Sequence, residues 1–290
     1  MEYFLKNNDA VATVSTAGGE LISYSVNGKE YLWNGDEKYW AGHAPVLFPF
    51  VSALADNTVK ISGTPCVFKD KHGFARKYEY TVEKINDREA VFLLVSDEST
   101  REQYPYDFEL RTIHRITDSG FTTTYSVTNA DNTDIVFCVG GHPGILLNEP
   151  IDKYKFVFDR PIAPDIFLVD SECRFSFDYK SDVKFKENGV LSLNYSDFDR
   201  DALLLCECGA ESVGMVLKED ESTGIRFGFA GFPVLAIWTP PKKQAPFICL
   251  EPWHGLPALV GESGNFEDKP YSVTLKPGEM REFTYSFDVF

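Results

Sequence analysis

Apolar and polar residues alternate with a period of two along much of the chain, which is the spacing of a β-strand with one buried face. Ile22, Tyr24 and Val26 alternate with serines and lead into Asn27-Gly28, a dipeptide that favours a tight hairpin turn because both positions tolerate positive φ. The same alternation recurs over residues 121–127 and 283–289. The pattern predicts antiparallel strands joined by short turns.

Turn residues separate these runs, and they stand at Asp118-Ser119-Gly120, Glu187-Asn188-Gly189 and Lys276-Pro277-Gly278-Glu279. Helical periodicity is scarce, and we expect only a turn or two of helix at residues 37–40 and 196–201. Residues 152–199 alternate less and carry more charge, which indicates long connections or edge strands. Because no linker or repeat divides the chain, we expect residues 1–290 to form one all-β domain.

Composition narrows the choice of partners. The 290 residues carry a formal charge of −16, and a field of that sign repels nucleic acid and mildly disfavours a phosphorylated substrate. The N-terminal residues lack the basic and apolar regions of a signal peptide, and no apolar run is long enough to span a bilayer. We therefore expect a cytoplasmic protein whose six cysteines are reduced and structural.

A few polar residues stand in settings that favour chemistry. His142 lies in Gly140-Gly141-His142-Pro143-Gly144, and His72 also has a glycine neighbour, so both are expected on loops that a ligand can approach closely. Glu251 follows an apolar run and precedes Pro252-Trp253, which predicts a partly desolvated carboxylate with a raised pKa at the end of a strand. For each of them a purely structural role, as a hydrogen-bonded loop histidine or a salt-bridged glutamate, remains the alternative.

Signatures of other enzyme classes are missing from the sequence. There is no glycine-rich phosphate loop and no Gly-x-Ser-x-Gly elbow. The histidines lack the close pairing of zinc sites, and Cys206-x-Cys208 alone is weak evidence for a metal. We therefore expect neither a metal nor another cofactor.

Taken together, several short motifs resemble the aldose 1-epimerase (mutarotase) family, and within it the LacX-like bacterial branch. The resemblance covers nearly the whole chain in a consistent order. The motifs that carry it are Gly18-Gly19-Glu20-Leu21, Glu30-Tyr31-Leu32-Trp33, Ala44-Pro45-Val46-Leu47-Phe48-Pro49, His72-Gly73-Phe74-Ala75-Arg76, Tyr104-Pro105-Tyr106, Gly140-Gly141-His142-Pro143, Ile237-Trp238-Thr239-Pro240 and Cys249-Leu250-Glu251-Pro252-Trp253.

The resemblance implies a large antiparallel β-sandwich of the galactose-mutarotase type, with a sugar site in a cleft on one sheet. It also implies that Glu251 is the general base, that His142 is the general acid, and that His72 binds the sugar. A carboxylate and an imidazole, each with a pKa tuned near neutral pH, can open and reclose a sugar ring without a metal or a nucleotide. Trp238 and Trp253 are expected to stack on the sugar, although core packing is an equal alternative for each.

The sequence departs from the family at one sugar-binding position. The family often has a Gly-Arg pair where this chain reads Phe50-Val51-Ser52-Ala53-Leu54, so Ala53 stands in place of the arginine. Arg76 is the candidate to replace it, and Asp201 is a loose match to the family's substrate-binding aspartate.

Three functions stay open at this point. The first is an anomerase for a free hexose. The second, motivated by the missing arginine, is a sugar-binding protein without catalysis. The third, motivated by the His-Gly-Phe-Ala-Arg motif, is a hexose-6-phosphate epimerase, which needs a basic subsite. A glycosidase is more distant because hydrolysis normally needs two opposed carboxylates.

Overall fold

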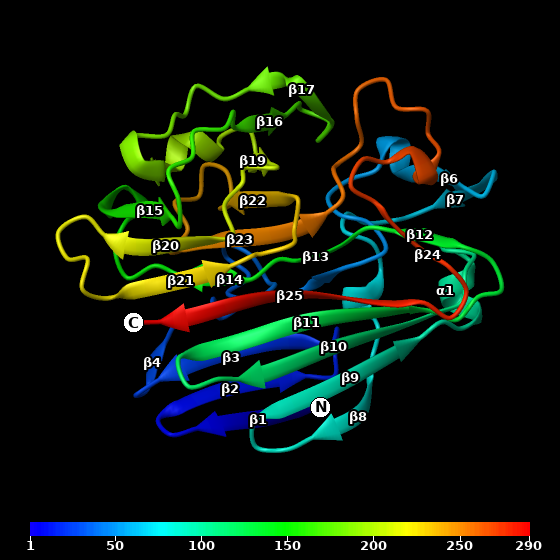
Figure 1. The fold of residues 1–290 in the computed structure, drawn as a ribbon, viewed down its shortest axis with the longest axis horizontal. Helices are drawn as coiled ribbons and strands as arrows, with labels where there is room; N and C mark the ends of the chain where they lie inside the picture. Colours follow the sequence, from blue (N-terminus) through cyan, green and yellow to red (C-terminus); the bar gives the residue numbers. More distant parts are fainter.

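The computed structural model describes residues 1–290, and nearly all of its regular structure is antiparallel β-sheet. The largest sheet crosses the whole molecule in Figure 1, from β15 and β20 past β25 to β8. Its nine strands, in spatial order, are β18 (Val190–Leu191), β15 (Tyr154–Phe158), β20 (Ser212–Leu217), β21 (Gly224–Gly228), β25 (Met280–Val289), β11 (Gly120–Asn129), β10 (Phe108–Ile116), β9 (Glu89–Val95) and β8 (Thr81–Ile85).

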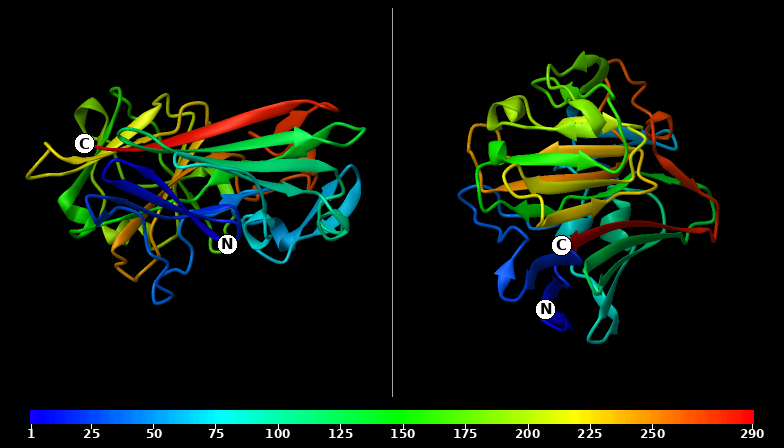
Figure 2. Two further views of the ribbon diagram at one scale, coloured as in Figure 1. Left: turned by 90° about the horizontal axis from the view of Figure 1, so that it is seen from below. Right: turned by 60° about the vertical axis from the view of Figure 1, so that its left-hand side comes forward.

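A second large sheet carries the central strand β23. Its eight strands are β17 (Phe175–Lys180), β16 (Phe167–Val169), β19 (Leu203–Cys206), β22 (Val234–Trp238), β23 (Phe247–His254), β13 (Val139–Gly141) and β5 (Val46–Leu47) in spatial order, with β14 (Gly144–Leu146) also pairing β23. Figure 2 shows the two sheets from two further sides. The antiparallel sandwich expected from the sequence is confirmed.

Smaller elements complete the fold. The N-terminal sheet contains β1 (Glu2–Asn7), β2 (Ala10–Ser15), β3 (Glu20–Val26) and β4 (Lys29–Glu30), and its strands β1 and β2 contact β10. Two-stranded pairs join β12 (Ile135–Phe137) to β24 (Val273–Leu275) and β6 (Thr58–Ile61) to β7 (Thr64–Val67). The single short α-helix is α1 (Glu98–Arg101), and the structure has no helix with the length and apolar character to cross a bilayer.

The alternating runs of the sequence face the core as expected. Phe121 of β11 stacks on Phe287 of β25 with 5.2 Å between the ring centroids. Tyr24 of β3 packs edge-to-face against Phe121, with 5.0 Å between their centroids. The hairpin turn lies at Asn27-Gly28, where both residues have positive φ. One continuous apolar cluster includes side chains from Leu5 to Phe287, so burial of these faces drives the association of the three sheets.

Three local expectations need correction or detail. Residues 37–39 form one turn, closed by the amides of Tyr39 and Trp40 on the carbonyl of Asp36, and residues 195–198 form a 3₁₀ turn. Within 152–199, β17 and β18 are edge strands, but β15 and β16 each lie between two neighbours. Their short apolar runs, such as Phe167–Val169, are long enough to pair on both sides.

His114 is a structural residue on β10, and it gives the stability of the fold a dependence on pH. Its ring bonds Thr123 Oγ1 at 3.1 Å and the carbonyl of Gly19 at 2.9 Å, and burial lowers the pKa of His114 to about 4. The unfolded chain therefore takes up a proton near the ordinary histidine pKa, whereas the folded chain does so only near pH 4. Stability is full above about pH 6.5 and falls as the pH decreases toward 4.

We expect His114→Gln to have a lower free energy of unfolding than the wild type near pH 7. Near pH 5 the gap between the two free energies should be about 2 kcal/mol smaller, because the wild type loses stability on protonation whereas glutamine takes up no proton. Urea unfolding of both proteins at the two pH values measures this gap. A gap that does not change with pH would show that His114 does not couple folding to protonation.

Candidate active site

All seven site residues proposed from the sequence line one cavity of about 660 Å³ that opens to solvent. His72, His142 and Glu251 lie in it together with Arg76, Asp201, Trp238 and Trp253. Sequence analysis missed several further lining residues, namely Trp40, Ser52, Lys71, Asp170, Cys173, Asp199 and Arg200. Most of these lie on irregular connections, where no periodic pattern marks the side that faces the cavity.

A break in one strand places His142 opposite Glu251. Strand β23 pairs with β14 around Cys249 and with β13 at Trp253, and residues 141–143 pass between those two partner strands in the same register but without ladder pairs to β23, so His142 lies across from Glu251. Prolines at 143 and 252 have no amide hydrogen to donate to a ladder, so both fit this interruption. Glu251 therefore lies inside β23, paired with Ala236 on β22, and not at a strand end as expected from the sequence.

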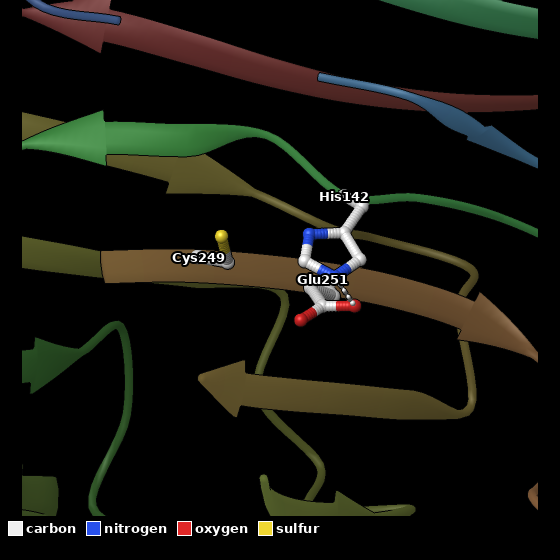
Figure 3. Close-up of side chains that lie close together, drawn as sticks. All are labelled: His142, Cys249 and Glu251. Carbon is white, nitrogen blue, oxygen red and sulfur yellow. Dashed lines mark ion pairs between the residues drawn. The ribbon is translucent and has the colours of Figure 1, made fainter. Parts of the chain in front are cut away.

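The imidazole of His142 and the carboxylate of Glu251 face each other. His142 Nε2 lies 3.3 Å from Glu251 Oε2, and the two side chains are 7% and 2% exposed. Figure 3 shows the ring of His142 directly beside the carboxylate. Trp40 stacks on the His142 ring at 4.7 Å between centroids, and Trp238 meets it edge-on at 5.4 Å. These indoles fix the plane of the ring and with it the direction of its nitrogens.

The pair is held in its neutral form by its surroundings. Burial raises the pKa of the Glu251 carboxyl well above its ordinary value, and the nearby charge of Asp201 raises it further. Burial lowers the pKa of His142 to about 3, and the positive charge of Arg76 acts in the same direction. Two groups that each resist ionisation, in contact with each other, share one proton across a wide range of pH.

His72 supplies a second imidazole to the same space. Its ring centroid lies 5.3 Å from that of His142, and its Nδ1 accepts a hydrogen bond of 2.9 Å from the amide of Ser52. Burial, and then the neighbouring His142, lower the pKa of His72 well below its ordinary value, so this ring is neutral. Since Nδ1 is an acceptor, the ring proton is on Nε2, and His72 is a hydrogen-bond donor to a ligand.

Gly73 is required by the close packing of the loop that carries His72. Its φ is +70°, and a Cβ there would lie 2.1 Å from the backbone oxygen of Phe48. We expect Gly73→Ala to cost about 2 kcal/mol or more in the free energy of unfolding because the obstacle is backbone. Gly63 is a matched control, since its φ is +75° and nothing lies within 4 Å of its Cβ position. Equal losses in urea unfolding of Gly73→Ala and Gly63→Ala would exclude the predicted clash.

Contacts among Lys71, Asp201 and Arg76 hold part of the charged cavity wall in place. Lys71 Nζ lies 3.8 Å from Asp201 Oδ2 and 2.9 Å from Cys173 Sγ, and Arg76 Nη2 donates to the carbonyl of Lys71 at 2.8 Å. Asp201 has a φ of +89°, which is strained for a residue with a side chain. Ser52 lines the cavity and Ala53 does not, and the amide of Ser52 donates the hydrogen bond to His72 Nδ1.

The remaining histidines lie outside this cavity. His254 Nε2 donates to the carbonyl of Gly231 at 2.9 Å, and the ring packs against Phe283 at 4.9 Å, which is a structural role. His43 lies 3.9 Å from Glu20, whose carboxylate also accepts from the amides of His43 and Ala44. This contact anchors the connection that carries Trp40 to the ring of His142.

Known proteins resemble this chain over its full length. The family model described as aldose 1-epimerase matches residues 1–288. The plasmid and chromosomal LacX proteins of Lactococcus lactis subsp. lactis are 30% identical over 302 residues, which cover 98% of this chain and 98% of theirs.

Solved structures agree with this match. A galactose mutarotase related enzyme from Lactobacillus acidophilus is 25% identical, with a TM-score of 0.92 over 100% of this chain and 97% of its own. A galactose mutarotase-like protein from Lactobacillus casei is also 25% identical, with a TM-score of 0.92 over the full length of both chains. On the match of the family model and of these relatives, the chain belongs to the aldose 1-epimerase family.

Proposed function

We propose that this protein is an active aldose 1-epimerase that interconverts the α and β anomers of a free hexose. The observation that carries the proposal is the Glu251–His142 pair, which lies 3.3 Å apart on the wall of a cavity large enough for a sugar. Anomer exchange removes a proton from the C1 hydroxyl and delivers one to the ring oxygen. A base and an acid that share one proton supply both halves of that reaction.

In the proposed reaction, the bound sugar meets the pair with the carboxylate of Glu251 ionised and His142 protonated. Proton transfer across the 3.3 Å contact gives this form from the neutral pair without a change in net charge. Glu251 takes the proton of the C1 hydroxyl while His142 donates from Nε2 to the ring oxygen, and the C1–ring oxygen bond breaks. Rotation about C1–C2, followed by the reverse transfers on the other face of the carbonyl, gives the second anomer.

The other residues of the cavity would orient the sugar. His72 offers its Nε2 proton to a hydroxyl group because its Nδ1 is occupied by the amide of Ser52. Trp238, Trp253 and Asp201 line the same space. The bond from Arg76 to the backbone carbonyl of Lys71 holds its guanidinium at the cavity wall, where it is the candidate to replace the arginine missing at Ala53.

The charge of the cavity favours a free sugar over a sugar phosphate. Four aspartates, Asp70, Asp170, Asp199 and Asp201, line it against three cations, Lys71, Arg76 and Arg200, while the carboxyl of Glu251 is uncharged in the neutral pair. The ammonium group of Lys71 already contacts Asp201 and Cys173. A phosphate group normally requires an excess of donors with positive charge, which this wall does not offer.

Polarimetry of freshly dissolved α-D-glucose, α-D-galactose and D-glucose 6-phosphate tests the proposal. We expect the protein to accelerate the decay of optical rotation for a free hexose and to act less on the phosphate. Equal rates with and without phosphate would contradict the substrate class. Saturable binding by calorimetry without acceleration for any of these sugars would instead identify a sugar-binding protein without catalysis.

A further inference from the structure

Cys249 adds a third potential metal ligand to the pair that faces the sugar. One ring nitrogen of His142, the Sγ of Cys249 and one carboxylate oxygen of Glu251 lie within 4.8 Å of one another, and all three residues are buried. Cys249 and Glu251 are two residues apart on β23, so their side chains leave the same face of the strand. Figure 3 shows both of them beside the ring of His142.

Two atoms of this cluster have no hydrogen-bond partner. They are His142 Nδ1 and Glu251 Oε2, in residues that are only 6% and 1% exposed. Buried polar side-chain atoms are nearly always paired in folded proteins, and an unpaired one needs an explanation from its function or from a bound group. His142 Nδ1 is therefore unpaired, and Glu251 Oε2 has only its 3.3 Å contact with His142 Nε2, at the edge of a cavity that admits solutes.

The type of donor selects the type of metal. An imidazole, a thiol and a carboxylate form the mixed nitrogen, sulfur and oxygen set that zinc accepts, whereas magnesium and calcium prefer oxygen ligands alone. The two acidic ligands neutralise a divalent cation once their protons leave to solvent. Three protein ligands also leave the fourth tetrahedral position open to a water molecule from the cavity.

We propose that His142, Cys249 and Glu251 form an inhibitory binding site for zinc at the edge of the sugar cavity. A zinc ion there takes the lone pairs that the pair needs for proton transfer, so metal binding and anomer exchange exclude each other. Ligand atoms around tetrahedral zinc lie roughly 3.3–3.8 Å apart, so no pair in the cluster has to approach by more than about 1.5 Å on binding. The inhibition rests on the proposed anomerase activity, whereas the binding of metal does not.

Cobalt is the spectroscopic probe for the binding site, because a thiolate bound to Co²⁺ gives a strong near-ultraviolet absorption band. We expect that band in the reduced wild-type protein and in Cys66→Ser, a matched variant at a buried cysteine that is not part of the cluster with His142 and Glu251. Cys249→Ser and Cys249→Ala are expected to lose the band and to bind zinc in calorimetry at least about 10-fold more weakly. A band that persists in both variants, or is absent from the wild type, would overturn the site.

Kinetics test the inhibitory role separately. We expect zinc to inhibit anomer exchange by the wild type reversibly, with recovery after addition of EDTA. Cys249→Ser should keep its basal rate and need at least about 10-fold more zinc for the same inhibition. If the wild type shows no anomerase activity, the cobalt spectrum still decides the binding site. Unchanged zinc inhibition in a folded Cys249→Ser would contradict the proposal.

Discussion

Glu251→Gln is expected to lower the rate of anomer exchange by about 10²-fold or more while the protein stays folded. Glutamine keeps the size and the hydrogen-bonding capacity of the side chain but cannot accept the C1 hydroxyl proton. The effect should fall on kcat more than on KM, because the lost proton transfer occurs only in the transition state. Polarimetry or magnetisation-transfer NMR over a range of sugar concentrations separates the two constants.

The folded state of this variant can be checked independently of its activity. Burial raises the pKa of the Glu251 carboxyl, so the folded protein bears the cost of an acid that cannot ionise freely at neutral pH. Glutamine removes that cost, and the melting temperature of Glu251→Gln should not fall. Glu282→Gln, at an exposed position of β25, is the control for loss of a carboxylate alone. Wild-type activity in a folded Glu251→Gln would remove Glu251 from the mechanism.

His142→Asn is expected to cause a loss of similar size, because the ring oxygen then lacks its proton donor. The two changes should not add: the double variant Glu251→Gln, His142→Asn is expected to be about as slow as either single variant. The reason is that the two groups exchange one proton as a unit across 3.3 Å, so removal of either partner disables both.

Rates of the wild type, both single variants and the double variant form a cycle that measures this coupling. Losses that multiply in the double variant would mean that Glu251 and His142 act on separate steps. A His142→Asn variant with near-normal kcat would move the role of general acid to His72, whose ring lies 5.3 Å away.

Much of the fold follows from local pattern in the sequence. The alternation over residues 121–127 and 283–289 predicts strands with one apolar face, and β11 and β25 indeed bury Phe121 against Phe287. Turn chemistry predicts the hairpin at Asn27-Gly28. The order of strands in the sheets is not predictable in this way, because pairing between segments as distant as β11 and β25 depends on the packing of the complete core. The Lys276–Glu279 turn illustrates this, since it leads from a small two-stranded sheet into the largest one.

The site was predictable where short motifs combine glycine or proline with a polar residue. His72, His142 and Glu251 stand out in the sequence for that reason, and the structure brings them to one cavity. Trp40 and Cys249 have no such signal, because an aromatic or a thiol beside apolar residues has the appearance of ordinary core. Their relation to His142 arises from the break between β13 and β14, which only the three-dimensional pairing reveals.

A crystal structure of Glu251→Gln with its preferred hexose tests the central claim most directly. The account predicts that the anomeric hydroxyl lies within hydrogen-bond distance of the residue 251 side chain, that the ring oxygen lies within reach of His142 Nε2, and that His72 donates to another hydroxyl group. A sugar bound with its anomeric carbon turned toward solvent, or bound away from this pair, would contradict it.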